Sequence, residues 1–394
     1  MRERSHHLQG MFTIAAIVAS SALNYGYTLL LGRVLNAEGY GAYASFTSLF
    51  MILAALPVAF QQAQARRSDG QLSRVAVTWG AVAGGLLLLG AVPLGPLLGV
   101  PAAWVMAFAL TLPGMVLLGA WRGAAQRDGR VLAFGGSLIA EHGLKIALTF
   151  PLLHVLGGPV AAVTATLAGV LLALPLVRPA GPDAGARLRS DATALPLALA
   201  AASQSALLYG DVLLGGMHLH AGDAGVYAAA ATLARAVFFA GWAVQVAVFP
   251  VVARGDAAHG RLLGTALGGT LLLAGVPAAL FAVWPQVFAG LAFGPALGAQ
   301  VAAVLPACAA GTLLLTLGAT VLNHLLAAGS AATVGRSAGL YAGGAAVLAV
   351  LALSLGSTPS SLALAALIGK GALLPASFLV LFTTLNRRPV YVLR

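Results

Sequence analysis

The chain has 394 residues, of which 60% are hydrophobic and 8% are charged, and its mean hydropathy is +0.95. A soluble domain of this length needs far more charged surface, and no polar stretch is long enough to form one. The apolar runs are long, rich in Leu and Ala and without alternation, which argues against a β-barrel.

Apolar runs long enough to cross ~30 Å of hydrocarbon as helices follow one another along the chain. The first run follows Arg2 and Arg4, as the apolar segment of a signal peptide follows basic residues, but it is longer than such a segment typically is. We therefore predict an all-α polytopic membrane protein of about twelve transmembrane helices. The runs cover residues 10–31, 42–64, 75–93, 102–120, 131–153, 160–177, 192–217, 225–252, 262–284, 298–325, 337–356 and 360–384.

The basic residues are distributed unevenly over the connections between these runs. If the N-terminus lies inside, the inner segments hold 17 of the 21 Lys and Arg residues, and the outer connections hold only Arg33. This asymmetry follows the positive-inside rule. It predicts a multi-pass protein of the bacterial inner membrane with both termini cytoplasmic. The net charge of +11 then reflects membrane topology, and no nucleic-acid partner is expected.

An internal repeat relates the two halves of the chain. Residues 22–49 and 206–233 align without a gap, and 13 of the 28 positions are identical, among them Tyr25/Tyr209, Gly41/Gly225 and Tyr43/Tyr227. The repeat places the first two helices on the seventh and eighth. Because this offset is an even number of helices, the two halves share one orientation in the membrane.

Parallel halves related by an axis along the membrane normal are typical of alternating-access transporters. We therefore predict two parallel six-helix lobes around a central cavity that carries the substrate. The N-terminal lobe is expected over residues 1–178, a cytoplasmic linker over 179–191, and the C-terminal lobe over 192–394.

Three segments resemble a known family. The run LLLGRVLNAEGYGAYASF, from Leu29 to Phe46, is similar to the first loop and second helix of polysaccharide or O-antigen repeat-unit flippases. That family belongs to the multidrug/oligosaccharidyl-lipid/polysaccharide exporter superfamily. The second copy, GDAGVYAAAATLARAVFF, resembles the eighth helix of that family, and Leu117–Arg130 resembles its loop between helices 4 and 5. The extra C-terminal helix pair of lipid II flippases has no counterpart here, which favours the repeat-unit flippases.

The resemblance implies a flippase that moves an isoprenoid-pyrophosphate-linked oligosaccharide from the inner to the outer leaflet for surface polysaccharide synthesis. Such a protein needs a cationic group for the pyrophosphate and a polar lining for the sugars. Its implied partners are the lipid-linked glycan, membrane lipid and polysaccharide polymerase machinery, and it needs no cofactor.

Other functions remain as alternatives. A cation-coupled multidrug exporter of the same superfamily is the first, and a membrane glycan polymerase or ligase is the second, although such an enzyme usually has a large outer loop. A major-facilitator transporter also has twelve helices, but residues 66–70 lack its charged loop pattern. The sequence contains no nucleotide-binding Gly-rich loop and no metal-binding His-Glu-x-x-His, so neither catalysis nor a metal is expected. Cys308 is the single cysteine, so no intrachain disulfide is possible.

The span over 131–153 carries a polar stripe that includes Glu141 and Lys145. These residues are four positions apart and can neutralise one another on one helix face. Charged groups inside a membrane are expensive and are usually paired or functional. The stripe is therefore either a structural ion pair or part of the cavity lining, with Lys145 available to an anion.

The span over 225–252 carries Arg235, with Trp242 and Gln245 on nearly the same face. A guanidinium suits a pyrophosphate and an indole suits a sugar ring. The alternative is that Arg235 pairs with Asp211 of the preceding span. Asp211 could instead couple transport to a cation.

The last span contains Lys370, which lies between two glycines and is a weaker substrate-binding candidate. The predicted substrate-binding residues are Arg235, Lys145, Lys370, Trp242 and Gln245, and the predicted ion-pair or cation-coupling residues are Asp211 and Glu141.

Overall fold

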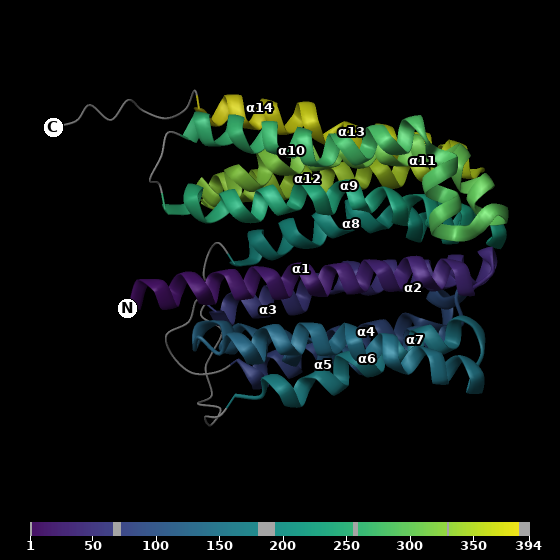
Figure 1. The fold of residues 1–394 in the computed structure, drawn as a ribbon, viewed down its shortest axis with the longest axis horizontal. Helices are drawn as coiled ribbons and strands as arrows, with labels where there is room; N and C mark the ends of the chain where they lie inside the picture. The colour runs from purple at the N-terminus through teal and green to yellow at the C-terminus, as the bar shows by residue number, and fades with distance from the viewer. Residues whose placement is uncertain (1, 66–71, 180–193, 255–258, 329–330, 386–394) are drawn as a thin grey trace. The chain divides into compact units, whose positions relative to one another are not determined.

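A computed structural model describes residues 2–65, 72–179, 194–254, 259–328 and 331–385, and every regular element in these ranges is a helix. The chain divides into two compact units, Met1–Ala194 and Leu195–Arg394. The predicted linker over 179–191 lies outside the described residues, except for its first position. Within each unit the long helices lie side by side and run along a common direction (Figure 1).

In unit 1, α5 packs on α3, α4 and α7, while α6 packs on α1 and α7. The side chains that reach between these helices form the buried polar contacts of this unit. Its helices are α1 (Arg2–Val34), α2 (Ala37–Leu53), α3 (Ala55–Ala65), α4 (Ser73–Leu97), α5 (Ala102–Arg127), α6 (Val131–Val155) and α7 (Gly158–Val177).

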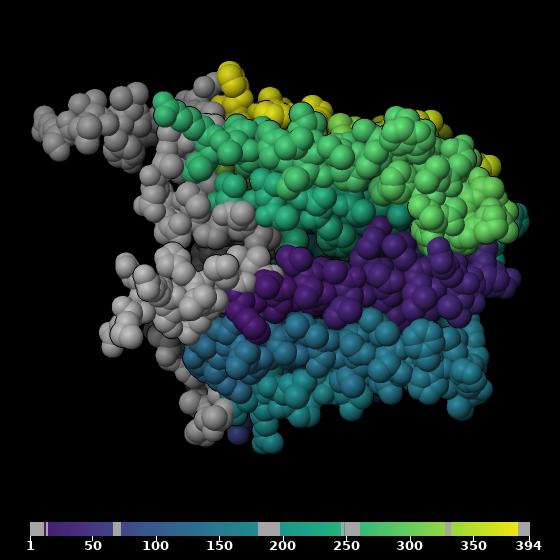
Figure 2. All heavy atoms as spheres, in the orientation of Figure 1, coloured from purple at the N-terminus to yellow at the C-terminus, as the bar shows by residue number. Residues whose placement is uncertain are grey.

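In unit 2, α11 is central, because it packs on α9, α10, α13 and α14. The side chains of α10 lie on the outside of this unit on the face shown in Figure 2. Its helices are α8 (Ala194–His218), α9 (Ala221–Arg254), α10 (His259–Val283), α11 (Pro285–Ala328), α12 (Ala331–Leu355), α13 (Pro359–Gly371) and α14 (Leu373–Leu385).

The helices confirm a polytopic membrane protein of about twelve spans. Within the described ranges, 11 segments are long and apolar enough to cross a membrane. The remaining predicted run, 192–217, coincides with α8, a helix of 25 residues that is interrupted by polar side chains such as Gln204 and Asp211. Outward-facing leucines are highly exposed, with Leu89 at 82% and Leu272 at 64%, as side chains in contact with lipid must be.

Two of the predicted runs are broken helices. The run 42–64 forms α2 and α3 with a break at Ala54, and the run 360–384 forms α13 and α14 with a break at Ala372. Pro57 and Pro375 each follow the break by three positions. Proline lacks an N–H for the carbonyl four residues earlier and its ring crowds that carbonyl, so each break has a local cause.

The start of α11 differs from the prediction. We expected the helix from residue 298 and a loop before it, but α11 begins at Pro285 and contains one non-helical position at Gly294, with φ 80° and ψ 173°. Only glycine adopts this backbone region readily, so the chain turns there without ending the helical hydrogen bonding on either side. The two parts then pack closely, since a Cβ on Gly298 would lie 2.8 Å from the Gly290 Cα.

Candidate functional site

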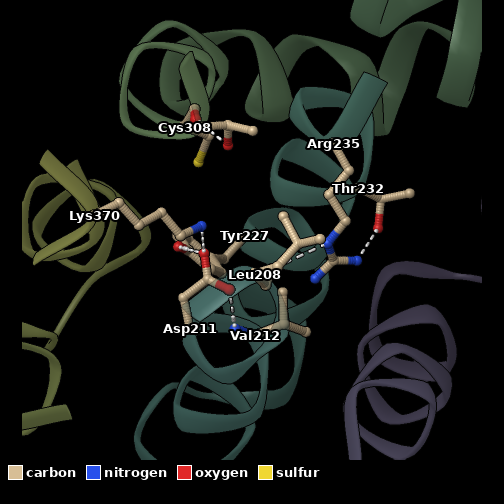
Figure 3. A network of polar contacts seen from close by, with 9 residues as sticks. Leu208, Asp211, Val212, Tyr227, Thr232, Arg235, Cys308 and Lys370 are labelled. Atoms are coloured by element: carbon tan, nitrogen blue, oxygen red, sulfur yellow. Dashed lines mark hydrogen bonds and ion pairs between the residues drawn. The ribbon is translucent and has the colours of Figure 1, made fainter. Parts of the chain in front are cut away.

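A buried carboxylate on α8 forms the centre of the polar network in unit 2. Asp211 is 1% exposed, and the Lys370 ammonium of α13 lies 2.5 Å from its Oδ2. The Tyr227 hydroxyl of α9 donates to the same oxygen at 2.8 Å, and the Val212 N–H donates to Oδ1 at 2.9 Å. Figure 3 shows these three donors converging on the carboxylate. Both oxygens of Asp211 are therefore hydrogen-bonded.

The alternative in which Asp211 pairs with Arg235 is thus wrong: its ion pair is with Lys370. The two partners are 159 residues apart, and the packing of α13 on α9 and α11 accompanies their contact. Nothing in the local sequence around Asp211 signals this proximity.

Arg235, on α9, is a buried cation with no ion pair to a carboxylate in the described part of the chain. Its guanidinium carbon lies 4.4 Å from the centroid of the Tyr209 ring. Nε donates to the Leu208 carbonyl at 3.3 Å and Nη1 donates to the Thr232 hydroxyl at 3.4 Å (Figure 3). Nη2 is buried and has no hydrogen-bond partner. One face and two nitrogens of this side chain are therefore occupied, and one nitrogen is free.

Trp242 was expected on nearly the same face of the helix as Arg235, and the seven residues between them rise about 10 Å along α9. Tyr209 provides the aromatic contact instead, and Trp242 is half-buried.

Gln245 belongs to a separate network between α9 and α11. Its Nε2 donates to the Thr320 hydroxyl at 3.1 Å, and its Oε1 accepts from Asn323 Nδ2 at 2.6 Å. The amide of Gln245 is satisfied by these contacts.

In unit 1, the ion pair between Glu141 and Lys145, one of the two interpretations of the polar stripe, does not form. Arg122 of α5 lies 2.7 Å from Glu141 and also donates to the Ser137 hydroxyl at 3.0 Å and the Ser137 carbonyl at 2.9 Å. The sequence placed Arg122 in an inner connection, but α5 continues to Arg127 and buries it. The forked guanidinium of Arg122 bonds the Glu141 carboxylate and the Ser137 backbone together.

Lys145 therefore has neutral partners. The side chain is 4% exposed, its Nζ lies 2.5 Å from Asn24 Oδ1, and the same atom lies 4.4 Å from the centroid of the Tyr27 ring. The Tyr27 hydroxyl shares a 2.7 Å hydrogen bond with Thr149 one turn after Lys145. The ammonium is thus held between α1 and α6, and no carboxylate of the described residues contacts it.

The two units have a common arrangement. In each, one buried cation, Lys145 or Arg235, lies over a tyrosine ring from the repeated segment and contacts no carboxylate among the described residues. The repeat aligns Tyr27 with Asp211 and Tyr43 with Tyr227, and the two positions are in contact in both units. In unit 1 the rings of Tyr27 and Tyr43 lie 6.3 Å apart, and in unit 2 the Tyr227 hydroxyl donates to Asp211. None of these tyrosines was among the predicted site residues, although Tyr25/Tyr209 and Tyr43/Tyr227 are identities of the repeat.

Comparison with known proteins gives the fold. No family model and no curated protein matches the chain. A multidrug resistance MATE transporter in an inward-facing conformation superposes with a TM-score of 0.74 at 13% identity, over 95% of this chain and 98% of that one. The lipid II flippase MurJ, inward closed, also gives 0.74 at 13% identity, over 96% and 88% of the two chains. A MOP superfamily transporter from Pyrococcus furiosus gives 0.61 at 15% identity, over 96% and 94%.

The chain has the fold of the MOP superfamily transporters. The likeness extends over both units rather than over one lobe, which excludes the major-facilitator alternative for the fold. This is also the fold that the resemblance in the sequence implied. Its members compared above are transporters and flippases.

Proposed function

We propose that this protein is a flippase that moves an isoprenoid-pyrophosphate-linked oligosaccharide from the inner to the outer leaflet. The two units are its lobes, and alternating access of a cavity between parallel lobes is its mechanism. The observation that supports this function best is Arg235: a buried guanidinium that contacts no carboxylate in the described structure and has an unpartnered Nη2.

A cation in a membrane span is tolerated when an anion or a hydrated path compensates it. For Arg235 the described residues supply a ring face and two neutral acceptors, but no carboxylate in direct contact. A phosphate oxygen would complete its hydrogen bonding, and a change of state of the transporter would give that oxygen access to Nη2. Lys145, whose partners are also neutral, is the second phosphate-binding candidate, with Trp242 and Gln245 on the sugar path.

The alternative, a cation-coupled multidrug exporter, requires a carboxylate that exchanges its cation with solution. Glu141 and Asp211 are the acids within the predicted spans, and each holds a basic side chain, at 2.7 Å and 2.5 Å respectively. Neither oxygen of Asp211 is free of a donor, and a cationic drug would meet Arg235, which contacts no carboxylate of the described residues. These contacts favour an anionic substrate.

The same proposal places the protein in the bacterial inner membrane with both termini cytoplasmic, beside the polymerase machinery that would consume its product. Reconstituted vesicles test the function directly. We expect a fluorescent isoprenoid-pyrophosphate oligosaccharide to become accessible to an impermeant quencher in the opposite leaflet, whereas the uncharged isoprenoid alcohol carrying the same sugars does not. Gradient-driven uptake of a cationic dye, without movement of the glycolipid, would identify the exporter instead.

A further inference from the structure

The environment of Asp211 carries an inference about ion coupling. The titratable and charged groups that face it are Lys370 from α13, Tyr227 and Arg235 from α9, and Cys308 from α11 (Figure 3). Among them, Lys370 makes the direct ion pair, and Lys370 is itself only 3% exposed. The Tyr227 hydroxyl donates to the same carboxylate oxygen, and the Val212 N–H donates to the other.

A carboxylate buried in a membrane span needs a positive partner, and three kinds are available. A proton or a small metal ion from solution can bind and leave, which makes the carboxylate a coupling site. A lysine ammonium is covalently attached to the protein and cannot leave. The identity of the partner therefore decides whether an ion gradient can act through the carboxylate.

We infer that Lys370 is a fixed internal cation that occupies the place of a coupling ion at Asp211. Na⁺ and protons do not exchange at this carboxylate, because the Lys370 ammonium neutralises it and Tyr227 and a backbone N–H also donate to its oxygens. The consequence for transport rests on the proposed function: lipid flipping draws on neither a Na⁺ nor a proton gradient through Asp211.

The inference also predicts a latent site. Replacing Lys370 with Met keeps much of the side-chain volume and removes the ammonium. The two carboxylate oxygens of Asp211 and the hydroxyl of Tyr227 then remain, a set of hard oxygen donors that suits a proton or Na⁺. The variant is expected to acquire an ion dependence that the wild-type protein lacks.

The experiment measures the melting temperature of the purified full-length protein, with Na⁺ exchanged for choline at constant ionic strength and with the pH lowered from 8 to 6. The wild-type Tm should not change with Na⁺. The Lys370→Met variant should gain at least about 2 °C from Na⁺ or from the lower pH, since a ligand that binds only the folded state raises Tm. The double variant Lys370→Met/Asp211→Asn is the matched control, because it removes both charges and should show neither gain.

Two results would overturn the inference. The first is a wild-type Tm that rises with Na⁺ when the Tm of the double variant does not, since Asp211 would then bind ions despite Lys370. This comparison needs no single Lys370 variant, so it holds even if Lys370→Met fails to accumulate. The second uses the variant Lys370→Met/Arg235→Gln, which also removes Arg235, the other cation facing Asp211, so that it cannot replace Lys370. If this protein folds and its Tm responds neither to Na⁺ nor to the lower pH, the inference is wrong.

The readout needs no glycolipid. A protein that does not flip the labelled glycolipid, but in which Lys370→Met gains the ion response, would disprove the proposed function and leave the inference intact. The reverse combination would disprove the inference alone.

Discussion

The buried basic residues fall into two kinds, those that neutralise a carboxylate and those that contact neutral groups. Arg122 neutralises Glu141 across the α5–α6 contact, and Lys370 neutralises Asp211 across unit 2. Arg235 and Lys145 contact neutral groups instead. Truncating a residue of the first kind strands a buried carboxylate, whereas truncating one of the second kind does not. Stability and transport should therefore separate among these variants.

For Arg235 we expect loss of transport without loss of protein. Arg235→Ala should reduce glycolipid transfer at least about tenfold, because the charge-assisted hydrogen bonds to phosphate are lost. Arg235→Lys should restore it in part, since lysine keeps the charge without the fork. Rates in vesicles at matched protein content measure both, with the exposed Arg261→Ala as the control. Full transfer by well-folded Arg235→Ala would remove this residue from the site and leave Lys145 to be tested.

For Arg122 we expect the opposite result. Arg122→Ala leaves Glu141 unpaired in a buried place, at a cost of about 3–5 kcal/mol, so the protein should melt at lower temperature and accumulate less. Adding Glu141→Gln should recover most of the loss. A single variant as stable as the wild type would show that this ion pair contributes nothing to folding.

At the scale of elements, breaks inside helices have backbone causes that can be tested one at a time. Gly294 adopts φ 80° and ψ 173° inside α11. An alanine there is strained by about 1–3 kcal/mol. Gly294→Ala should therefore lower the melting temperature, whereas Gly268→Ala should be neutral or slightly stabilising, because Gly268 is helical and has open space around its Cβ position. Equal melting temperatures for the two variants would contradict the strain argument.

At the scale of the whole molecule, the positions of the basic residues predict the orientation of the protein in the membrane. The uneven distribution of Lys and Arg predicts cytoplasmic signals from reporter fusions after Arg67, Arg130 and Arg189, and periplasmic signals near Glu38, Gly157 and Asp223. Protease and reporter assays in intact cells and spheroplasts measure each position. A periplasmic signal at Arg189 would break the parity of the two six-helix halves and, with it, the parallel-lobe arrangement.

The sequence by itself determined the membrane class, the approximate number of helices and the all-α fold class. These properties depend on local information: apolar length sets a span, and short motifs carry the resemblance. Asp211, Glu141, Lys145, Arg235 and Lys370 were identified as unusual for the same reason, since a charge within an apolar run is visible without a structure.

Only the tertiary structure decided which of these charges are paired. The i,i+4 spacing suggested Glu141 with Lys145, and adjacent helices suggested Asp211 with Arg235, but the actual partners are Arg122 and Lys370. Arg122 comes from a neighbouring helix, and Lys370 lies 159 residues after Asp211 in the sequence. An ion pair forms where helix packing brings a donor and an acceptor into contact, and sequence spacing constrains that only within one helix.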